Sequence, residues 1–126
     1  VHAGRPGMMS GIVLRAVDTM TDLGARSIRA VVGPSVCGRC YEVPEAMRAD
    51  AAMISPAASA VSWHGTPAID VAAGAVEQLR SRSIAVQWIA GCSRASDDLF
   101  SYRRAHRTGR YAGVVRLLGA DGEGRE

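Results

Sequence analysis

Two helical stretches, each with one apolar face, alternate along this chain with short runs of β-branched residues. Apolar residues recur at three- and four-residue steps from Met8 to Leu23, and Gly24 follows where a left-handed residue would end a helix. The run Ile28–Val32 is typical of a buried strand and stops at a Gly-Pro pair. A strand that ends at Val1 would complete a first strand–helix–strand unit.

A second unit follows the same plan. Asp70 stands where an N-cap is expected, and the apolar residues from Val71 to Leu79 predict one buried helical face. The strand Ile84–Ile89 would close this unit. The other expected elements are an extended piece at Cys40–Val43, a short helix after Pro44, a loop over Met53–Pro67 with a short strand at Val61–Trp63, and a terminal strand at Tyr111–Leu118.

Two helical crossovers between strands predict an α/β (α+β) fold, in which helices pack on a mixed sheet. Because Val1 has the character of the end of a buried strand that delivers His2 into a glycine-rich turn, we expect the fold to be N-terminally incomplete. Residues 119–126 are rich in Gly, Asp and Glu, and we expect a disordered tail there. The predicted organisation is thus one unit over residues 1–118, followed by this tail.

Charge and aromatic content argue against a nucleic-acid partner. All 15 basic residues are arginine, they are spread along the chain, and the formal net charge is only +3. Two Trp, three Tyr and one Phe leave little for a base-stacking platform. We therefore expect no DNA or RNA partner.

The sequence also lacks the signals of a membrane or secreted protein. No apolar run approaches the roughly 20 residues that a membrane span needs, and no charged segment precedes an apolar one as in a signal peptide. Three cysteines, an odd number, fit a reducing compartment better than a disulfide framework. We expect a cytoplasmic protein without a membrane partner.

Histidine and cysteine residues are the candidate metal ligands. His2 is followed by Ala and Gly, which leave room for a metal ion, although the pattern alone favours a histidine held within a turn. Cys37 and Cys40 form a C-x-x-C, which by itself suggests half of a structural zinc site or a redox pair. No second close pair of ligands completes it, so we expect these two cysteines to be structural or to line a pocket. The remaining candidates are interpreted as a buried inert thiol at Cys92 and ordinary loop histidines at His64 and His106.

Arg103 and Arg104 form a compact cationic cluster within Phe-Ser-Tyr-Arg-Arg. Guanidinium groups bind phosphate in a bidentate manner, although such arginines can also be solvated or paired with Asp97 and Asp98. Glu42 follows an aromatic residue in an extended stretch, so it is either exposed by strand alternation or paired inside. If it is exposed, it faces either the outer surface or the side of a cleft.

Three segments together resemble the YfiH family, over residues 1 to about 118. The family patterns HAGWRG, GPCIGPCCYEV and FFSYRRD-x-x-TGR stand in the same order as segments here, at similar spacing, and they belong to the C-terminal half of the family. The departures are Arg5 at the tryptophan position, Pro6 at the arginine position, Leu99 at the first aromatic and Ala105 at the aspartate. The matching segments are Val1-His2-Ala3-Gly4-Arg5-Pro6-Gly7, Gly33-Pro34-Ser35-Val36-Cys37-Gly38-Arg39-Cys40-Tyr41-Glu42-Val43, and Leu99-Phe100-Ser101-Tyr102-Arg103-Arg104 with Thr108-Gly109-Arg110.

Members of this family were long described as multicopper polyphenol oxidases or laccases. The family is now associated with zinc-dependent purine nucleoside phosphorolysis and, in some bacteria, with peptidoglycan editing. The resemblance implies that His2 is one of three zinc ligands, the others being a histidine and a cysteine earlier in the chain. A multicopper site needs many histidines, so the three in this chain argue against copper. The other residues that the resemblance implies are Arg5, Arg103 and Arg104 for phosphate or substrate, and Cys37 and Glu42 for the pocket lining.

We therefore expect a purine nucleoside phosphorylase, which converts adenosine, inosine or guanosine and phosphate to free base and ribose 1-phosphate. The resemblance also allows an adenosine deaminase side activity. Because only one of the three expected zinc ligands, His2, is present, two alternatives remain open. The chain is a truncated or degenerate fragment without catalytic activity, or it belongs to an editing hydrolase that acts on a peptidoglycan precursor.

Overall fold

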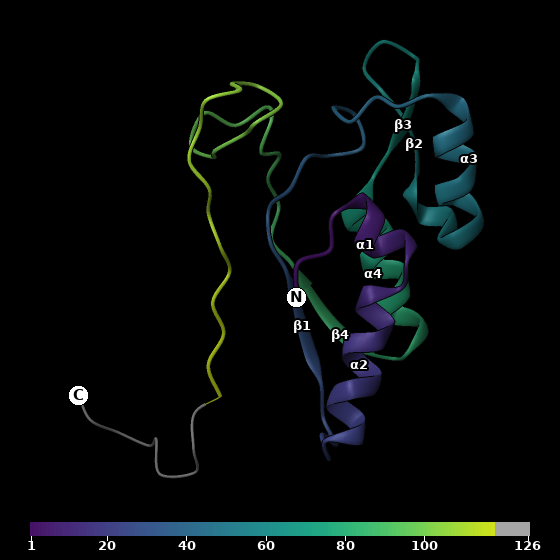
Figure 1. The fold of residues 1–126 in the computed structure, drawn as a ribbon, viewed down its shortest axis with the longest axis vertical. Coiled ribbons are helices and arrows are strands. Elements are labelled where there is room, and N and C mark those ends of the chain that lie inside the picture. Colours follow the sequence, from purple (N-terminus) through teal and green to yellow (C-terminus); the bar gives the residue numbers. More distant parts are fainter. Residues whose placement is uncertain (118–126) are drawn as a thin grey trace.

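The computed structural model describes residues 1–117, and the tail expected at residues 119–126 lies outside this range (Figure 1). The helices are α1 (Arg5–Met9), α2 (Ile12–Asp22), α3 (Glu45–Ile54), the 3-10 turn η1 (Pro56–Ala58) and α4 (Val71–Ser81). The strands are β1 (Arg29–Val32), β2 (Ser59–Val61), β3 (Pro67–Ile69) and β4 (Ala85–Trp88). Over residues 1–117, no helix has both the length and the apolar character that a membrane crossing requires.

β1 and β4 form a parallel pair that α2 and α4 cover. The register puts Arg29 opposite Ala85 and Val32 opposite Trp88. α2 and α4 lie beside this strand pair (Figure 1). A cluster of buried side chains lies between the helices and the strands, and its strand side is formed by partly buried apolar residues. The buried members are Val13, Val17, Ala75 and Leu79. This is the crossover arrangement that the alternation of helices and strands predicts.

β2 and β3 form an antiparallel hairpin beside α3. The segment 41–43 runs along the other edge of β3, where Val43 N donates to Pro67 O and Ile69 N donates to Tyr41 O. The predicted α/β class is confirmed, since helices pack on both parallel and antiparallel strand pairs. The parallel and antiparallel pairings belong to two separate two-stranded sheets among the described residues, rather than to one continuous sheet.

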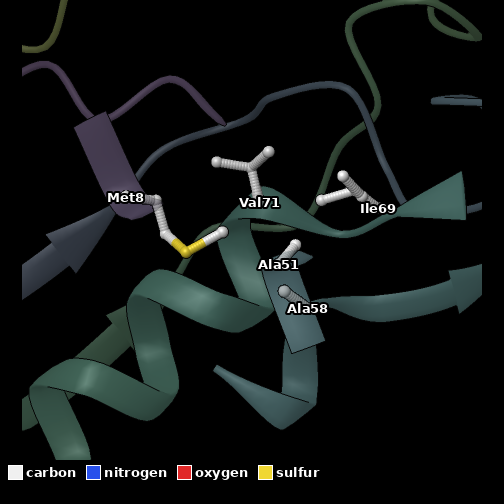
Figure 2. Close-up of a cluster of buried hydrophobic side chains, with 5 residues drawn as sticks. All are labelled: Met8, Ala51, Ala58, Ile69 and Val71. Carbon is white, nitrogen blue, oxygen red and sulfur yellow. The ribbon is translucent and has the colours of Figure 1, made fainter. Parts of the chain in front are cut away.

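A second cluster of buried side chains joins α1, α3, η1 and the start of α4 (Figure 2). Its members are Met8, Ala51, Ala58, Ile69 and Val71. Gly74 of α4 makes this packing possible, because a Cβ atom there would lie 3.0 Å from Ala58 Cβ and 3.1 Å from Met8 Sδ. The thioether of Met8, which is fully buried, fills the space that a larger residue at position 74 would take.

The helix predicted from Met8 to Leu23 is in fact two helices. Gly11 adopts a left-handed backbone with φ +78°, which ends α1 and lets α2 begin in a new direction. The predicted end of the second helix is confirmed, since Gly24 is left-handed with φ +96° and Ala25 N donates to Met20 O. The short strand expected at Val61–Trp63 lies two residues earlier, in β2.

One predicted strand is wrong. Residues 111–117 of the expected terminal strand form no strand, because within the described part of the chain they pair with no neighbouring backbone. Val114, Val115 and Leu117 are each more than nine-tenths exposed, and Tyr111 Oη is anchored by donating to Pro34 O at 2.8 Å. The strand expected to end at Val1 would precede the first described residue, so it stays a prediction.

Asp70 is the N-cap of α4, as the sequence predicts: its Oδ1 accepts a hydrogen bond from Ala73 N at 2.8 Å. Replacing Asp70 by Ala leaves this backbone donor without its partner, so we expect Asp70→Ala to lower the free energy of unfolding by about 1 kcal/mol. Asp70→Asn keeps an acceptor oxygen and is the matched control. Denaturant unfolding of both variants measures the difference, and equal losses would contradict the capping role.

Candidate functional site

The carboxyl ends of β1 and β4 open onto a cavity of about 460 Å³. Parallel strands end at the same edge of their sheet, and ligands of α/β proteins bind beyond that edge. Past the strands, the two segments stay together through a parallel bridge between Ser35 and Cys92. The lining residues are Ser35, Cys37, Asp70, Ala72, Trp88, Ala90, Gly91 and Cys92.

Three cysteines meet at this edge. The sulfur atoms of Cys37, Cys40 and Cys92 all lie within 4.8 Å of one another, and each side chain is half-buried. Cys37 and Cys40 are joined by a tight turn in which Cys40 N donates to Cys37 O at 2.9 Å. Cys92 arrives from the segment after β4, and its sulfur accepts a hydrogen bond from Cys37 N at 3.4 Å. Within residues 1–117, this is the one group of three or more ligand-type side chains close enough to hold a metal ion.

The turn between Cys37 and Cys40 depends on Gly38. A Cβ atom at position 38 would lie 2.8 Å from the Cβ atoms of both Ala60 and Asp70. Such a distance is far below ordinary van der Waals contact, so only glycine lets the turn sit against the hairpin and the start of α4. The backbone of the turn is therefore held close to the cavity wall.

The thiols of this group differ in acidity. Burial raises the pKa of Cys40 to about 11, and hydrogen bonds that its thiol shares with Cys37 and Cys92 add to the increase. Burial also acts to raise the pKa of Cys92, but hydrogen bonds from backbone N–H groups, that of Cys37 first among them, lower it to about 7. A stable negative charge in this cluster is thus best accommodated at Cys92.

Cys92 is not the buried thiol that the sequence predicts, whereas its inertness stays a prediction. Its side chain is half-buried, it lines the cavity, and it lies beside the C-x-x-C. No ligand-like spacing in the sequence reveals this, since Cys92 is 52 residues after Cys40. The signal that could have found it is the parallel pairing itself, because Cys37 and Cys92 stand at similar distances after two strands that end at the same edge.

The two arginines of the cationic cluster are used differently. Arg103 is exposed, and its guanidinium lies over the ring of Tyr41 at 4.3 Å from the centroid. Over residues 1–117 it makes no ion pair or hydrogen bond, so its N–H groups stay available to a ligand. Arg104 instead donates to the carbonyl oxygens of four residues in the preceding loop. These acceptors are Ser93, Arg94, Ser96 and Leu99.

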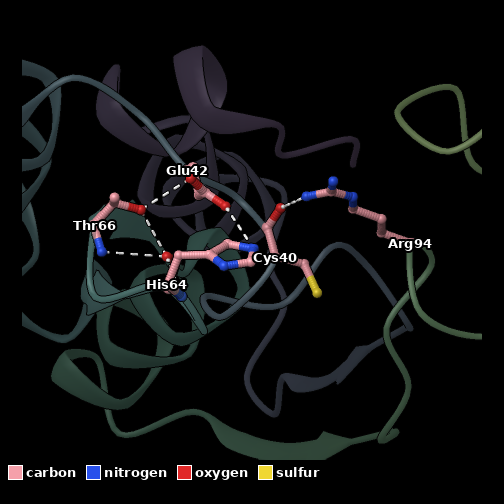
Figure 3. A network of polar contacts seen from close by, with 6 residues as sticks. Cys40, Glu42, His64, Thr66 and Arg94 are labelled. Atoms are coloured by element: carbon pink, nitrogen blue, oxygen red, sulfur yellow. Dashed lines mark hydrogen bonds and ion pairs between the residues drawn. The ribbon is translucent and has the colours of Figure 1, made fainter.

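Glu42 lies in a polar network at the tip of the β2–β3 hairpin (Figure 3). Its Oε2 accepts from Thr66 Oγ1 at 2.9 Å, and its Oε1 is 3.8 Å from Nε2 of His64. Ser62 Oγ is 2.6 Å from Thr66 Oγ1 and extends the network inward. Glu42 is not among the residues that line the cavity, whereas Cys37 is. Figure 3 also shows Arg94, whose Nη1 donates to Cys40 O at 2.8 Å.

His2 and Arg5 lie at the start of α1. The imidazole of His2 is exposed and turns back over Gly4, where its Nε2 would be 3.2 Å from a Cβ atom. Arg5 is half-buried; its Nη1 lies 3.8 Å from Met9 Sδ, and its buried Nε has no hydrogen-bond partner in residues 1–117. The three-cysteine group does not include His2, so among the described residues His2 belongs to no group of three or more ligand-type side chains.

Comparisons with known proteins place these features in a family context. A family described as multi-copper polyphenol oxidoreductase laccase matches residues 1–118. The chain is 52% identical over 119 residues to a purine nucleoside phosphorylase of Streptomyces coelicolor, an alignment that covers 92% of this chain and 49% of that protein. It is 50% identical over 120 residues to a purine nucleoside phosphorylase of Streptomyces griseus, covering 92% and 48%.

A more distant relative is the purine nucleoside phosphorylase YfiH of Shigella flexneri. The identity is 32% over 126 residues, covering 94% of this chain and 50% of that protein. The chain thus spans about half the length of the curated relatives it matches. No solved structure matches the chain.

Arg104 holds the loop 93–99, so Arg104→Ala is expected to loosen that loop. One charge-assisted hydrogen bond is worth about 1.5 kcal/mol, and we expect the amides of Ser96 and Leu99 to exchange with deuterium at least about tenfold faster. Arg103→Ala removes the same charge from the neighbouring position without touching these carbonyls and is the matched control. Hydrogen exchange followed by mass spectrometry measures both, and unchanged protection in Arg104→Ala would contradict the assignment.

Proposed function

The chain belongs to the multi-copper polyphenol oxidoreductase laccase family, and from this membership we propose that it forms one part of a purine nucleoside phosphorylase. The observation that carries the proposal is its similarity to proteins of that name, at up to 52% identity over nine-tenths of the chain. Purine nucleosides and inorganic phosphate are the proposed substrates. The absence of nucleic-acid and membrane partners and the cytoplasmic location stay predictions from the sequence.

In phosphorolysis an oxygen of inorganic phosphate attacks C1′ of the nucleoside. The bond from C1′ to the purine nitrogen breaks, the base takes up a proton as it leaves, and ribose 1-phosphate is formed. The work of the protein is to hold the phosphate anion beside C1′ and to balance the charge that moves during bond exchange. Cationic groups fixed in place before the reaction are suited to this, because they need no rearrangement in the transition state.

Arg103 is the residue that we propose for phosphate. Its contact with the ring of Tyr41 fixes the plane of the guanidinium, while the N–H edges remain unpaired within residues 1–117. A planar, pre-oriented guanidinium can bind two phosphate oxygens at once. Arg104 is a weaker candidate for binding phosphate, since its guanidinium already donates hydrogen bonds to four backbone carbonyls. We therefore assign Arg104 the role of positioning the segment that carries Arg103.

Arg5 is proposed as a second contact for an anion. Its buried Nε has no acceptor among residues 1–117, and a buried donor without a partner costs free energy comparable to a lost hydrogen bond. An oxygen of the substrate or of phosphate would satisfy this group. Arg5 lies three residues after His2, at the first position of α1, so both side chains belong to the same short stretch of chain.

Zinc is the metal that we propose for the catalytic site of the phosphorylase, with His2 as one ligand. A neutral imidazole that is exposed and followed by small residues fits zinc in its donor chemistry. Within residues 1–117 His2 belongs to no group of three or more ligand-type side chains, so we propose that further ligands come from outside this range. When bound, zinc supplies Lewis-acid polarisation of an oxygen ligand. His2 itself contributes a ligand nitrogen whose orientation is set by the turn into α1.

The test compares this chain alone with the same chain co-expressed with the half of the Streptomyces coelicolor relative that it does not cover. We expect inosine and adenosine phosphorolysis from the two halves together, loss of that activity on His2→Ala, and none from the chain alone. Release of free base in a coupled assay provides the measurement. Zinc-dependent activity of the chain alone would contradict the proposal that ligands lie outside residues 1–117, and absence of activity in the complex would contradict the function.

Arg103→Ala is expected to weaken phosphate binding in the active complex, because a charge-assisted hydrogen bond to an anion is lost. A loss of about 1.5 to 3 kcal/mol corresponds to a roughly ten- to hundredfold rise in the phosphate KM. Arg107→Ala, at an exposed arginine of the same segment, is the matched control. Kinetics at varied phosphate and fixed inosine separate the two, and an unchanged phosphate KM in Arg103→Ala would assign Arg103 to packing on Tyr41 alone.

A further inference from the structure

We propose that Cys37, Cys40 and Cys92 bind one zinc ion, at a site separate from His2. The proposal starts from the convergence of three sulfur atoms within 4.8 Å of one another at the carboxyl edge of β1 and β4. It does not depend on the proposed phosphorolysis. Its ligand is a thiophilic divalent cation, for which three thiolates are a soft, matched donor set.

The spacing of the sulfurs suits one shared ion. Zinc–sulfur bonds of about 2.3 Å in a tetrahedral arrangement put sulfur atoms roughly 3.8 Å apart. The cluster, with all separations within 4.8 Å, therefore needs to contract by no more than about 1 Å. A disulfide would join only two of the three sulfurs and would leave unexplained why the third, from a segment 52 residues later in the sequence, is held beside them.

The surrounding backbone is arranged to hold the ligands before an ion arrives. Cys37 N donates to the sulfur of Cys92 at 3.4 Å, and such N–H groups stabilise a thiolate. Gly38 packs the C-x-x-C turn against Ala60 and Asp70 at distances that no side chain would allow. Pre-positioned ligands lower the conformational entropy that metal binding must overcome.

Charge also fits. Three thiolates and Zn²⁺ carry a net charge of −1, which needs a nearby cation in a half-buried place. Arg94 supplies one, since its guanidinium is fixed by the hydrogen bond to Cys40 O at 2.8 Å (Figure 3). Three protein ligands leave the fourth tetrahedral position to water or a small ligand, and the cavity lined by Cys37 and Cys92 gives it access.

The consequence of the site is a cross-link between two loops. Cys37 and Cys40 belong to the segment after β1, which continues into Tyr41, and Cys92 begins the segment that leads to Arg103. Arg103 stacks on Tyr41. An ion shared by the three cysteines would therefore restrain both of the segments that carry the partners of this contact. We therefore expect bound zinc to slow hydrogen exchange in residues 92–105.

The experiment uses the full 126-residue chain, reduced and freed of metal, and titrates it with Co²⁺ and then with Zn²⁺. We expect a cobalt–thiolate charge-transfer absorption that one equivalent of zinc abolishes, together with one zinc per chain by elemental analysis. Cys92→Ser should raise the zinc dissociation constant at least about tenfold, since losing a ligand costs no less than losing a supporting contact. Cys92→His restores a ligand and should recover zinc while weakening the cobalt–thiolate absorption.

His2→Ala is the matched control and should leave this zinc unchanged, which separates the site from the proposed catalytic metal. Hydrogen exchange of the α4 amides reports whether Cys92→Ser still folds. Loss of zinc in Cys92→Ser and rescue in Cys92→His, with α4 still protected, supports the site. Three results would overturn the site. The first is zinc binding that survives Cys92→Ser. The others are a chain that, purified under anaerobic conditions, holds copper in place of zinc or has two of these cysteines joined as a disulfide.

Discussion

The rest of this structure depends on α4, because α4 contributes to both clusters of buried side chains. Val71 packs in one cluster, and Ala75 and Leu79 pack in the other. The absence of a side chain at Gly74 lets the Met8 thioether approach the helix closely. From its N-terminal end, α4 also positions Asp70 against the C-x-x-C turn. The hydrophobic packing of this one helix thus determines where the carboxyl edge of the parallel strands lies relative to the hairpin.

The sequence was most informative where local chemistry decides the structure. The left-handed backbone at Gly24, the capping side chain of Asp70 and the helical face from Val71 to Leu79 all follow from short-range rules. Gly11 could not be distinguished from a tolerated helical glycine, because the apolar period continues through it. The terminal strand failed for a different reason: alternation and apolar content predict a strand, but a strand also requires a partner, and residues 111–117 have none within the described range.

The candidate site was predictable in its residue types but not in its grouping. Cys37 lines the cavity, yet its association with Cys92 follows from strand pairing, which only the fold provides. Arg103 and Arg104 are adjacent and chemically identical in the sequence. The structure separates them through their surroundings, one above an aromatic ring and the other among carbonyl oxygens. Such a division of roles depends on loop geometry, for which no pattern of residue types is a guide.

The hydrogen bonds from Arg104 to the loop 93–99 affect how this region can change over evolutionary time. Every acceptor that its guanidinium uses is a main-chain carbonyl, a group that all amino acids carry. The side chains at positions 93, 96 and 99 can therefore be exchanged without loss of these hydrogen bonds, whereas Arg94 also holds Cys40 O through its own side chain. Selection can alter the chemical character of the surface next to the cavity while the path of the backbone is inherited intact. Because one arginine holds the backbone, the shape of the loop does not depend on most of its side chains. A loop held by pairs of side chains could not change its sequence in this way.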